Sequence, residues 1–396
     1  MSRFDRIYGI GALALNRALE PLGFNWSAYF HKPRIIFSGI VELEGSPFQR
    51  GLVHGKLFES VIADLVQRSS LRDQLAKANP ELIENCRNQL LRFYLSRFPQ
   101  IVKEIEGIAT GAGLPFTEVF NYNIQPILLL DLSQSECTSV WLRSSNEEII
   151  HAGSQDSGLA DGSYLVKRVH GDRQSYVGGM VVGTTWTPFG MNTSGLTIGG
   201  ASVNSCKVPV LPSQQQVFEG LDVSAFMSVL LDSASTVEQA QQLLNDVPAI
   251  LPWNSGSNLI ISDAKGKVVR VEVCGDKHSY ETARGNPFFC TNHFIADEMR
   301  RWNRHDTPLV ENLHRASVAR YETIRTQFEV KNRRDLDGVL ELLTWHKQPG
   351  AVCRHYRRNG ELGQTTVSYV MLPSKKTMYY WIGNPCAHKR RQIILE

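Results

Sequence analysis

The sequence lacks long apolar runs and lacks a dominant charge. No stretch of about 18 uncharged apolar residues occurs in the 396-residue chain, so no segment is predicted to span a membrane as a helix. The 42 Lys and Arg nearly balance the 39 Asp and Glu, and the net charge of +3 does not indicate nucleic acid as a partner. With 42% hydrophobic residues, the composition is that of a well-packed globular protein.

Cysteine is also scarce and scattered. The seven cysteines are an odd number and contain no Cys-x-x-Cys pair, which indicates neither a disulfide framework nor a zinc knuckle. Most are expected to be buried small hydrophobes in a reducing compartment, and we therefore expect a cytoplasmic protein. They are Cys86, Cys137, Cys206, Cys274, Cys290, Cys353 and Cys386.

The N-terminal part reads as mainly helical up to about residue 130, after one strand at residues 35–43. Residues 7–22 have the apolar spacing of an amphipathic helix, although their first half also imitates a signal-peptide core. Gly51 and Gly55 fall inside a helical stretch, where each costs up to about 1 kcal/mol relative to alanine. Close packing against another backbone would explain them. A helix break is expected near Gly107.

The signals change after Cys137, where short apolar runs bounded by Gly, Asn and Ser follow one another. Helical segments are predicted only at about 222–245 and 310–345. Helices and strands are thus segregated rather than alternating, which favours a layered α+β fold. The predicted strands are 138–142, 149–152, 164–169, 176–183, 195–203, 258–262, 267–273, 366–372 and 377–382.

Residues 137–156 read as a β-hairpin with a polar turn. Antiparallel arms of similar length end side by side, so Asp156 is expected next to Cys137. A cysteine that opens an inner strand beside a carboxylate is a plausible nucleophile with an orienting group. Taken alone, the same pattern is also that of a core cysteine.

Three further positions are candidates, each with an ordinary structural alternative. Asn192 lies in a Gly-Met-Asn turn, where an architectural role is the default. Asn292 ends a buried run and has an amide that suits an oxyanion, as well as a loop cap. Ser317 and Arg320 are three residues apart on a predicted helix and therefore face the same way.

A papain-like alternative would pair Cys137 with a distant histidine such as His346 or His355. Eleven histidines make a Cys-then-His order almost unavoidable by chance, so that order carries no weight.

These motifs, in this order, resemble the penicillin-acyltransferase-type branch of the N-terminal-nucleophile (Ntn) hydrolases, the C45 cysteine peptidase family, which is related to acid ceramidase and bile-salt hydrolases. The resemblance extends from about residue 38 to residue 393. It rests on an ordered set of short matches: Gly45-Ser46-Pro47 with Gly51 and His54-Gly55, Cys137-Thr138-Ser139, Asp156, Gly190-Met191-Asn192 with Gly195-Leu196, Thr291-Asn292-His293-Phe294, Ser317 with Arg320, and Cys353-Arg354-His355.

The resemblance implies a four-layer αββα fold and self-cleavage between Glu136 and Cys137. Residues 1–136 would be a mainly helical segment released as a separate chain, and residues 137–396 the catalytic chain, the two together forming one domain. Cys137 would be the nucleophile, and its new α-amine the base. Asp156 would orient the amine, Asn292 would supply an oxyanion donor, and Arg320 and Asn192 would be weaker polar contributors.

The implied activity is hydrolysis of small acyl-amides, or acyl transfer with acyl-CoA as a possible co-substrate, through an acyl-thioester and without a metal or organic cofactor. The two cleaved chains would stay associated. Two departures stand out, because Gly153 replaces an arginine found in many relatives and Glu136 replaces the usual glycine before the scissile bond. An uncleaved, non-catalytic protein that binds a small acyl ligand or a partner protein is the alternative.

Overall fold

The computed structural model describes residues 39–75, 80–124, 136–157, 163–171, 173–203, 221–246, 253, 256–282, 285–305, 308–355 and 364–396. All of them belong to one compact unit, residues 38–396. The segment 7–22 and the first half of the expected strand 35–43 lie outside the described residues.

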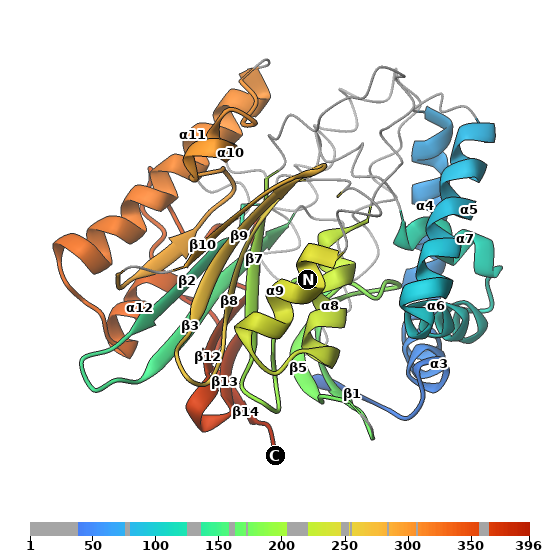
Figure 1. Ribbon diagram of the computed structural model, residues 1–396, viewed down its shortest axis with the longest axis horizontal. Coiled ribbons are helices and arrows are strands. Elements are labelled where there is room, and N and C mark those ends of the chain that lie inside the picture. Colours follow the sequence, from blue (N-terminus) through green and yellow to red (C-terminus); the bar gives the residue numbers. More distant parts are fainter. Residues whose placement is uncertain are drawn as a thin grey trace, which may run out of the picture. The chain divides into compact units, whose positions relative to one another are not determined.

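Two β-sheets form the centre of this unit (Figure 1). In spatial order, the first consists of β1 (Ile40–Glu44), β4 (Ser163–Val169), β5 (Tyr176–Val181), β6 (Phe189–Asn192), β7 (Thr197–Val203), β8 (Gly256–Ser262), β9 (Val268–Cys274) and β10 (Lys277–Thr282). The second consists of β11 (Phe288–Cys290), β2 (Thr138–Arg143), β3 (Ile149–Ser157), β12 (Gln364–Leu372), β13 (Thr377–Ile382) and β14 (Arg391–Ile394). β1 pairs with β4 in parallel, and the other strand pairs are antiparallel.

The two sheets pack face to face through an apolar core. Leu165, Val177 and Met191 of the first sheet share this core with Tyr369 and Met371 of the second. Successive side chains of a strand point to opposite faces, so the residues between these on β12 face the helices on the other side. The outer core there contains residues of α11, of the following π-helical turn and of α12.

Helices cover the outer face of each sheet (Figure 1). α8 (Val223–Ser233) and α9 (Val237–Asp246) contact the first sheet through β6, β7 and β8. α11 (Pro308–Arg325), a π-helical turn (Thr326–Val330) and α12 (Leu336–Leu343) cover the second sheet. This is the predicted α+β architecture, a four-layer αββα sandwich.

The N-terminal helices are α3 (Pro47–Leu57), α4 (Glu59–Leu75), α5 (Pro80–Arg97), α6 (Pro99–Ala112) and α7 (Phe116–Asn123). The expected close packing is confirmed, because a side chain at Gly51 would overlap the backbone of α6 at Glu104. Gly107, on α6, meets α3 in the same way at Phe48. The expected helix break at Gly107 is therefore wrong, since this glycine continues the helix and serves a helix–helix contact.

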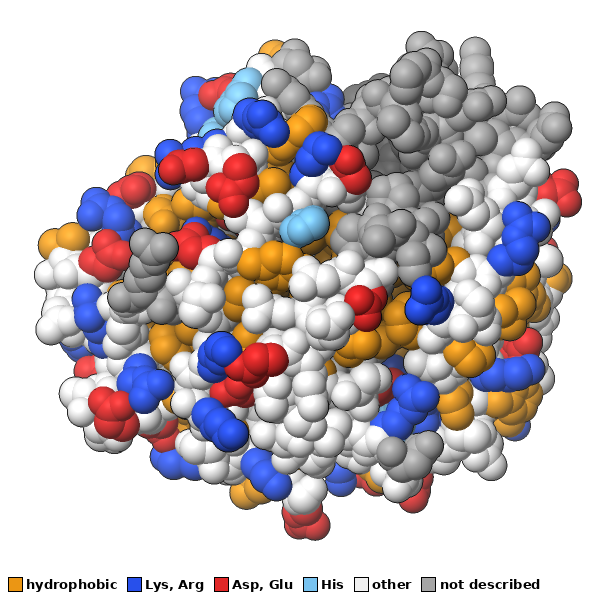
Figure 2. Space-filling model, in the orientation of Figure 1, with side chains coloured by type: hydrophobic (Ala, Val, Ile, Leu, Met, Phe, Trp, Pro, Cys, Tyr) orange, Lys and Arg blue, Asp and Glu red, His pale blue; other side chains and the backbone are white. Residues whose placement is uncertain are grey.

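The predicted strands after Cys137 are present with small shifts at their ends. Three strands were not predicted, namely β6, β10 and β14, which are short or carry several polar residues. Among the described residues, none of the helices combines the length and the apolarity that crossing a membrane requires. On the face shown in Figure 2, acidic and basic side chains are interspersed.

Candidate active site

Cys137 immediately precedes β2 and is buried. β2 pairs with β3 so that Thr138 faces Ser154, and extending this antiparallel register by one residue places Cys137 opposite Gln155. The side chains agree, because Cys137 Sγ lies 3.2 Å from Gln155 Oε1 and 3.8 Å from the carbonyl oxygen of Asp156. The predicted juxtaposition of Cys137 and Asp156 is therefore present.

Asn292 approaches Cys137 from the other neighbour of β2. In the β11–β2 pair Cys290 faces Ser139, and extending this register by two residues places Asn292 opposite Cys137. The Asn292 side-chain amide donates a hydrogen bond to the Ser202 carbonyl at 2.7 Å, which ties it to β7 of the other sheet. The nucleophile candidate thus lies between two polar residues, at a point where the two sheets meet.

α11 supports Asn292 from outside the sheet. Arg320 donates from Nη2 to Asn292 Oδ1 at 2.5 Å, which fixes the orientation of the amide. Ser317, three residues earlier, contacts His293 Nδ1 at 2.8 Å and Thr291 Oγ1 at 3.0 Å. Ser317 and Arg320 therefore face the same segment, as their spacing predicts.

Glu136, the residue before Cys137, carries a buried carboxylate held by two arginines. Its Oε2 pairs with Arg320 Nη1, and its Oε1 lies 3.0 Å from Arg354 Nη2. All three side chains are almost fully buried. Losing one partner of such a buried ion pair typically costs about 3–5 kcal/mol, because the other charge remains buried without compensation. The backbone on the N-terminal side of Cys137 is therefore strongly anchored.

Asp156 is buried, and neither of its carboxylate oxygens has a hydrogen-bond partner of normal geometry among the described residues. Burial raises the pKa of Asp156 to about 7, although Arg354, Arg320 and the hydroxyl of Thr365 all act to lower it. Glu136 adds a smaller effect that raises the pKa. Such a carboxyl group gains stability from a nearby cation.

Asn192, by contrast, has an architectural role. Its Nδ2 donates to the carbonyl oxygens of Leu231 and Ala234 at 3.0 and 2.7 Å, at the end of α8. Its Oδ1 accepts from the backbone of Ser194 and Leu196 within the turn after β6. Both ends of the amide are thus used to join that turn to the helix.

Sequence reasoning missed the roles of Gln155 and Arg354. Gln155 was adjacent to a predicted residue, and counting the hairpin register one position further would have identified it. Arg354 belongs to a recognised Cys-Arg-His motif, but its contact with Glu136 joins positions 218 residues apart and leaves no local signal. Gly153 is also explained, because a side chain there would overlap the Thr138 carbonyl and the Tyr369 ring.

His346 and His355, the bases of the papain-like alternative, have other sulfur neighbours. His355 Nε2 lies 3.2 Å from Cys386 Sγ and 3.6 Å from Cys353 Sγ. The ligand atoms of His346, His355 and Cys386 all lie within 4.8 Å of one another. This histidine and cysteine cluster is considered again below.

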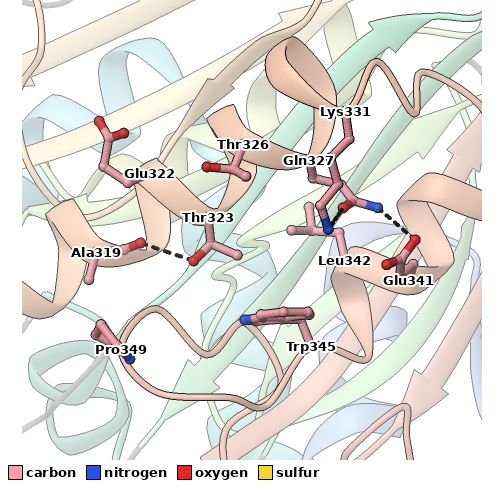
Figure 3. A pocket seen from close by; sticks show the side chains of 10 residues that line it. All are labelled: Ala319, Glu322, Thr323, Thr326, Gln327, Lys331, Glu341, Leu342, Trp345 and Pro349. Carbon is pink, nitrogen blue, oxygen red and sulfur yellow. Dashed lines mark hydrogen bonds between the residues drawn. The ribbon is translucent and has the colours of Figure 1, made fainter.

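A cavity of about 310 Å³ lies between α11, the π-helical turn and α12 (Figure 3). Ala319, Glu322 and Thr323 of α11 line it, and Trp345 lies across from them. It is lined by residues other than those around Cys137. The helix α11 thus contacts two places, the cavity and the Glu136 ion pair.

Comparison with known proteins shows the class to which this fold and site belong. Residues 144–387 match the family described as acyl-coenzyme A:6-aminopenicillanic acid acyl-transferase. The match covers more than half of the chain, so the chain belongs to this family, as the ordered motifs indicated. It begins after Cys137, so it does not itself include the nucleophile candidate. No match was found among curated proteins.

Three solved structures are similar to the chain. Penicillin V acylase from Agrobacterium tumefaciens is 16% identical, with a TM-score of 0.41 over 65% of this chain and 86% of the other. A variant of conjugated bile acid hydrolase from Clostridium perfringens is 13% identical, with a TM-score of 0.36 over 66% and 97%. The N-acylethanolamine-hydrolyzing acid amidase ortholog of Caenorhabditis elegans is 15% identical, with a TM-score of 0.37 over 60% and 93%.

Proposed function

We propose that this protein is an autoprocessing amidohydrolase or acyltransferase that acts on small acyl-amides through a thioester on Cys137. Its family supports acyl-amide chemistry. The observation that carries the cysteine assignment is the placement of Cys137 between Asn292 on one neighbouring strand and Gln155 with Asp156 on the other. Such a grouping supplies a nucleophile, an amide donor and a carboxyl group at one point.

The first step is self-cleavage of the bond between Glu136 and Cys137. The Cys137 sulfur attacks the Glu136 carbonyl carbon, the C–N bond breaks, and the thiol proton passes to the departing nitrogen. Water then hydrolyses the thioester, which leaves a carboxylate on Glu136 and an α-amine with a free thiol on Cys137. The anchoring of Glu136 by Arg320 and Arg354 supports this step, because it holds the scissile bond in place.

In the cleaved enzyme the α-amine of Cys137, with an ordinary pKa of about 8, acts as base for its own thiol. The unpaired carboxyl group of Asp156 is suited to orient this amine and to stabilise its protonated form. Asn292 donates a hydrogen bond to the developing oxyanion, an interaction typically worth about 3 kcal/mol. The acyl group then passes to water or to an amine, with an acyl-CoA as a possible donor.

Denaturing electrophoresis and mass spectrometry test self-cleavage. Dividing 44.5 kDa in proportion to length gives fragments of about 15 and 29 kDa for residues 1–136 and 137–396, with the larger beginning at Cys137. The Cys137→Ala variant is expected to remain a single chain. A wild-type chain that stays whole while it turns over acyl-amides would contradict the proposal.

A second experiment identifies the substrate class. Wild-type enzyme is mixed with a panel of acyl-amides and quenched in acid, and the larger fragment is weighed. A mass increase equal to the acyl group is expected in the wild type and absent in Cys137→Ala. An uncleaved chain that binds these ligands without turnover would instead support the non-catalytic alternative.

A further inference from the structure

The Cys-Arg-His motif at residues 353–355 takes part in a second cluster that the proposed reaction does not use. Cys353 Sγ lies 3.5 Å from Cys386 Sγ, and both sulfurs lie within 3.6 Å of His355 Nε2. The ring centroid of His346 lies 5.7 Å from that of His355, and its plane is nearly perpendicular. Two thiols and two imidazoles thus converge, although they are far apart in the sequence.

The spacing of these atoms is that of a tetrahedral zinc site. Zinc binds sulfur at about 2.3 Å and histidine nitrogen at about 2.0–2.1 Å, so tetrahedral ligand atoms lie roughly 3.3–3.8 Å apart. The distances among Cys353, Cys386 and His355 are 3.2, 3.5 and 3.6 Å, which agrees with that range. His346 lies further out, within 4.8 Å of His355 and Cys386, and its exposed ring can close the fourth position by rotating.

The surrounding polar groups support the same assignment. His346 donates from Nδ1 to the Thr344 carbonyl at 3.0 Å, which leaves Nε2 to face the cluster, and metal-binding histidines commonly show this arrangement. Asn384 directs its side-chain amide at Cys353 Sγ at 3.5 Å, an interaction that favours a thiolate. The backbone N–H of Cys353 is in turn held by the Trp345 carbonyl at 2.8 Å.

We propose that Cys353, Cys386, His346 and His355 bind one structural zinc ion. All four positions would be filled by protein, so the ion has no open site for a substrate and serves stability rather than catalysis. It joins the loop after α12 to the segment after β13. Two of its ligands flank Arg354, so the ion fixes the loop that presents this arginine to Glu136.

Metal content is the direct test. The untagged full-length protein, produced in zinc-supplemented medium and dialysed, is expected to hold about one zinc per chain by mass spectrometry of the metal. Cys386→Ser and His346→Gln are expected to lose most of it, whereas His278→Gln, which alters an exposed histidine of β10, is expected to keep it. Zinc retained by Cys386→Ser would overturn the site.

Cobalt gives a readout that needs no variant to fold. Wild-type protein reconstituted with Co²⁺ is expected to show the visible bands of tetrahedral cobalt and near-ultraviolet sulfur-to-cobalt charge transfer. An octahedral spectrum, or a Cys353–Cys386 disulfide in metal-free protein as isolated, would overturn the proposal. The measurements are repeated on Cys137→Ala, so their outcome is independent of self-cleavage.

Discussion

At the scale of single residues, Asp156 makes the precursor's stability depend on pH. Its folded pKa is raised to about 7 from an ordinary value of 3.8, so the folded chain holds the proton more tightly than the unfolded chain. The resulting stabilisation is complete below about pH 4 and is lost as the pH rises through 7. An asparagine at this position carries no such dependence.

We therefore expect Asp156→Asn, made in a Cys137→Ala background to prevent cleavage, to equal its parent in stability near pH 4 and to exceed it at pH 8 by on the order of 4 kcal/mol. Urea unfolding at each pH measures the difference. Asp276→Asn, which removes an exposed carboxylate paired with Lys277, serves as the control and is expected to shift by less than about 1 kcal/mol. A pH-independent difference for Asp156→Asn would refute this interpretation.

Glu136 gives a second prediction at the same scale. In the Cys137→Ala background, Glu136→Gln removes the negative charge between Arg320 and Arg354, and both guanidinium groups remain buried. We expect a loss of about 3–5 kcal/mol in the free energy of unfolding. The matched control is Glu147→Gln, which breaks the exposed pair with Arg143 and is expected to cost less than about 1 kcal/mol. Equal effects of the two variants would contradict the anchoring of Glu136.

How much of the site the sequence predicts depends on how local each contact is. Cys137 and Asp156 share one hairpin, so period and turn signals are enough to bring them together. The proximity of Asn292 and Arg320 came from a resemblance to a family, since β11 and α11 lie more than 140 residues beyond the hairpin. The cluster of Cys353, Cys386 and the two histidines was missed, because a motif search looks for nearby cysteines.

At the scale of elements, the contact between α3 and α6 depends on glycine. A Cβ at Gly107 would overlap the Phe48 carbonyl and lie 2.8 Å from the Leu52 amide, and both neighbours are backbone that cannot move aside. We expect Gly107→Ala to destabilise the protein by about 1–3 kcal/mol or more, although alanine is the better helix former. Thermal unfolding measures this, and Gly171→Ala, with no atom within 4 Å of the added Cβ, is the control. An unchanged melting temperature for Gly107→Ala would mean that the two helices do not pack this closely.

The fold class was predictable because helices and strands are segregated along the chain. The missed strands have physical explanations. β10 and β14 lie at sheet edges, where polar and charged residues are common because one side of the strand has no partner. β6 has four residues, fewer than a periodic pattern needs to be recognised. Segregation alone does not reveal which strand lies beside which, so the spatial order required the structure.

At the scale of the whole molecule, the segment before Cys137 is part of the packed structure. β1 completes the first sheet beside β4, and α6 places Glu104 in a buried ion pair with Arg168 of β4. Gly183 donates its backbone N–H to His54 Nε2 at 2.9 Å, which joins α3 to the loop after β5. Cutting the chain at Cys137 breaks none of these contacts.

We therefore expect the two fragments to elute together in gel filtration under native conditions and to separate only in denaturant. Isolated residues 137–396 would expose the strand edge of β4 and bury Arg168 without Glu104, and are expected to aggregate. Glu104→Gln probes the ion pair, and should release the smaller fragment at a lower urea concentration than the wild type does. Glu106→Gln, on an exposed part of α6, should leave that concentration unchanged. Separate native elution of the wild-type fragments would show that the N-terminal segment is dispensable after cleavage, and it would leave the sheet to be completed in another way.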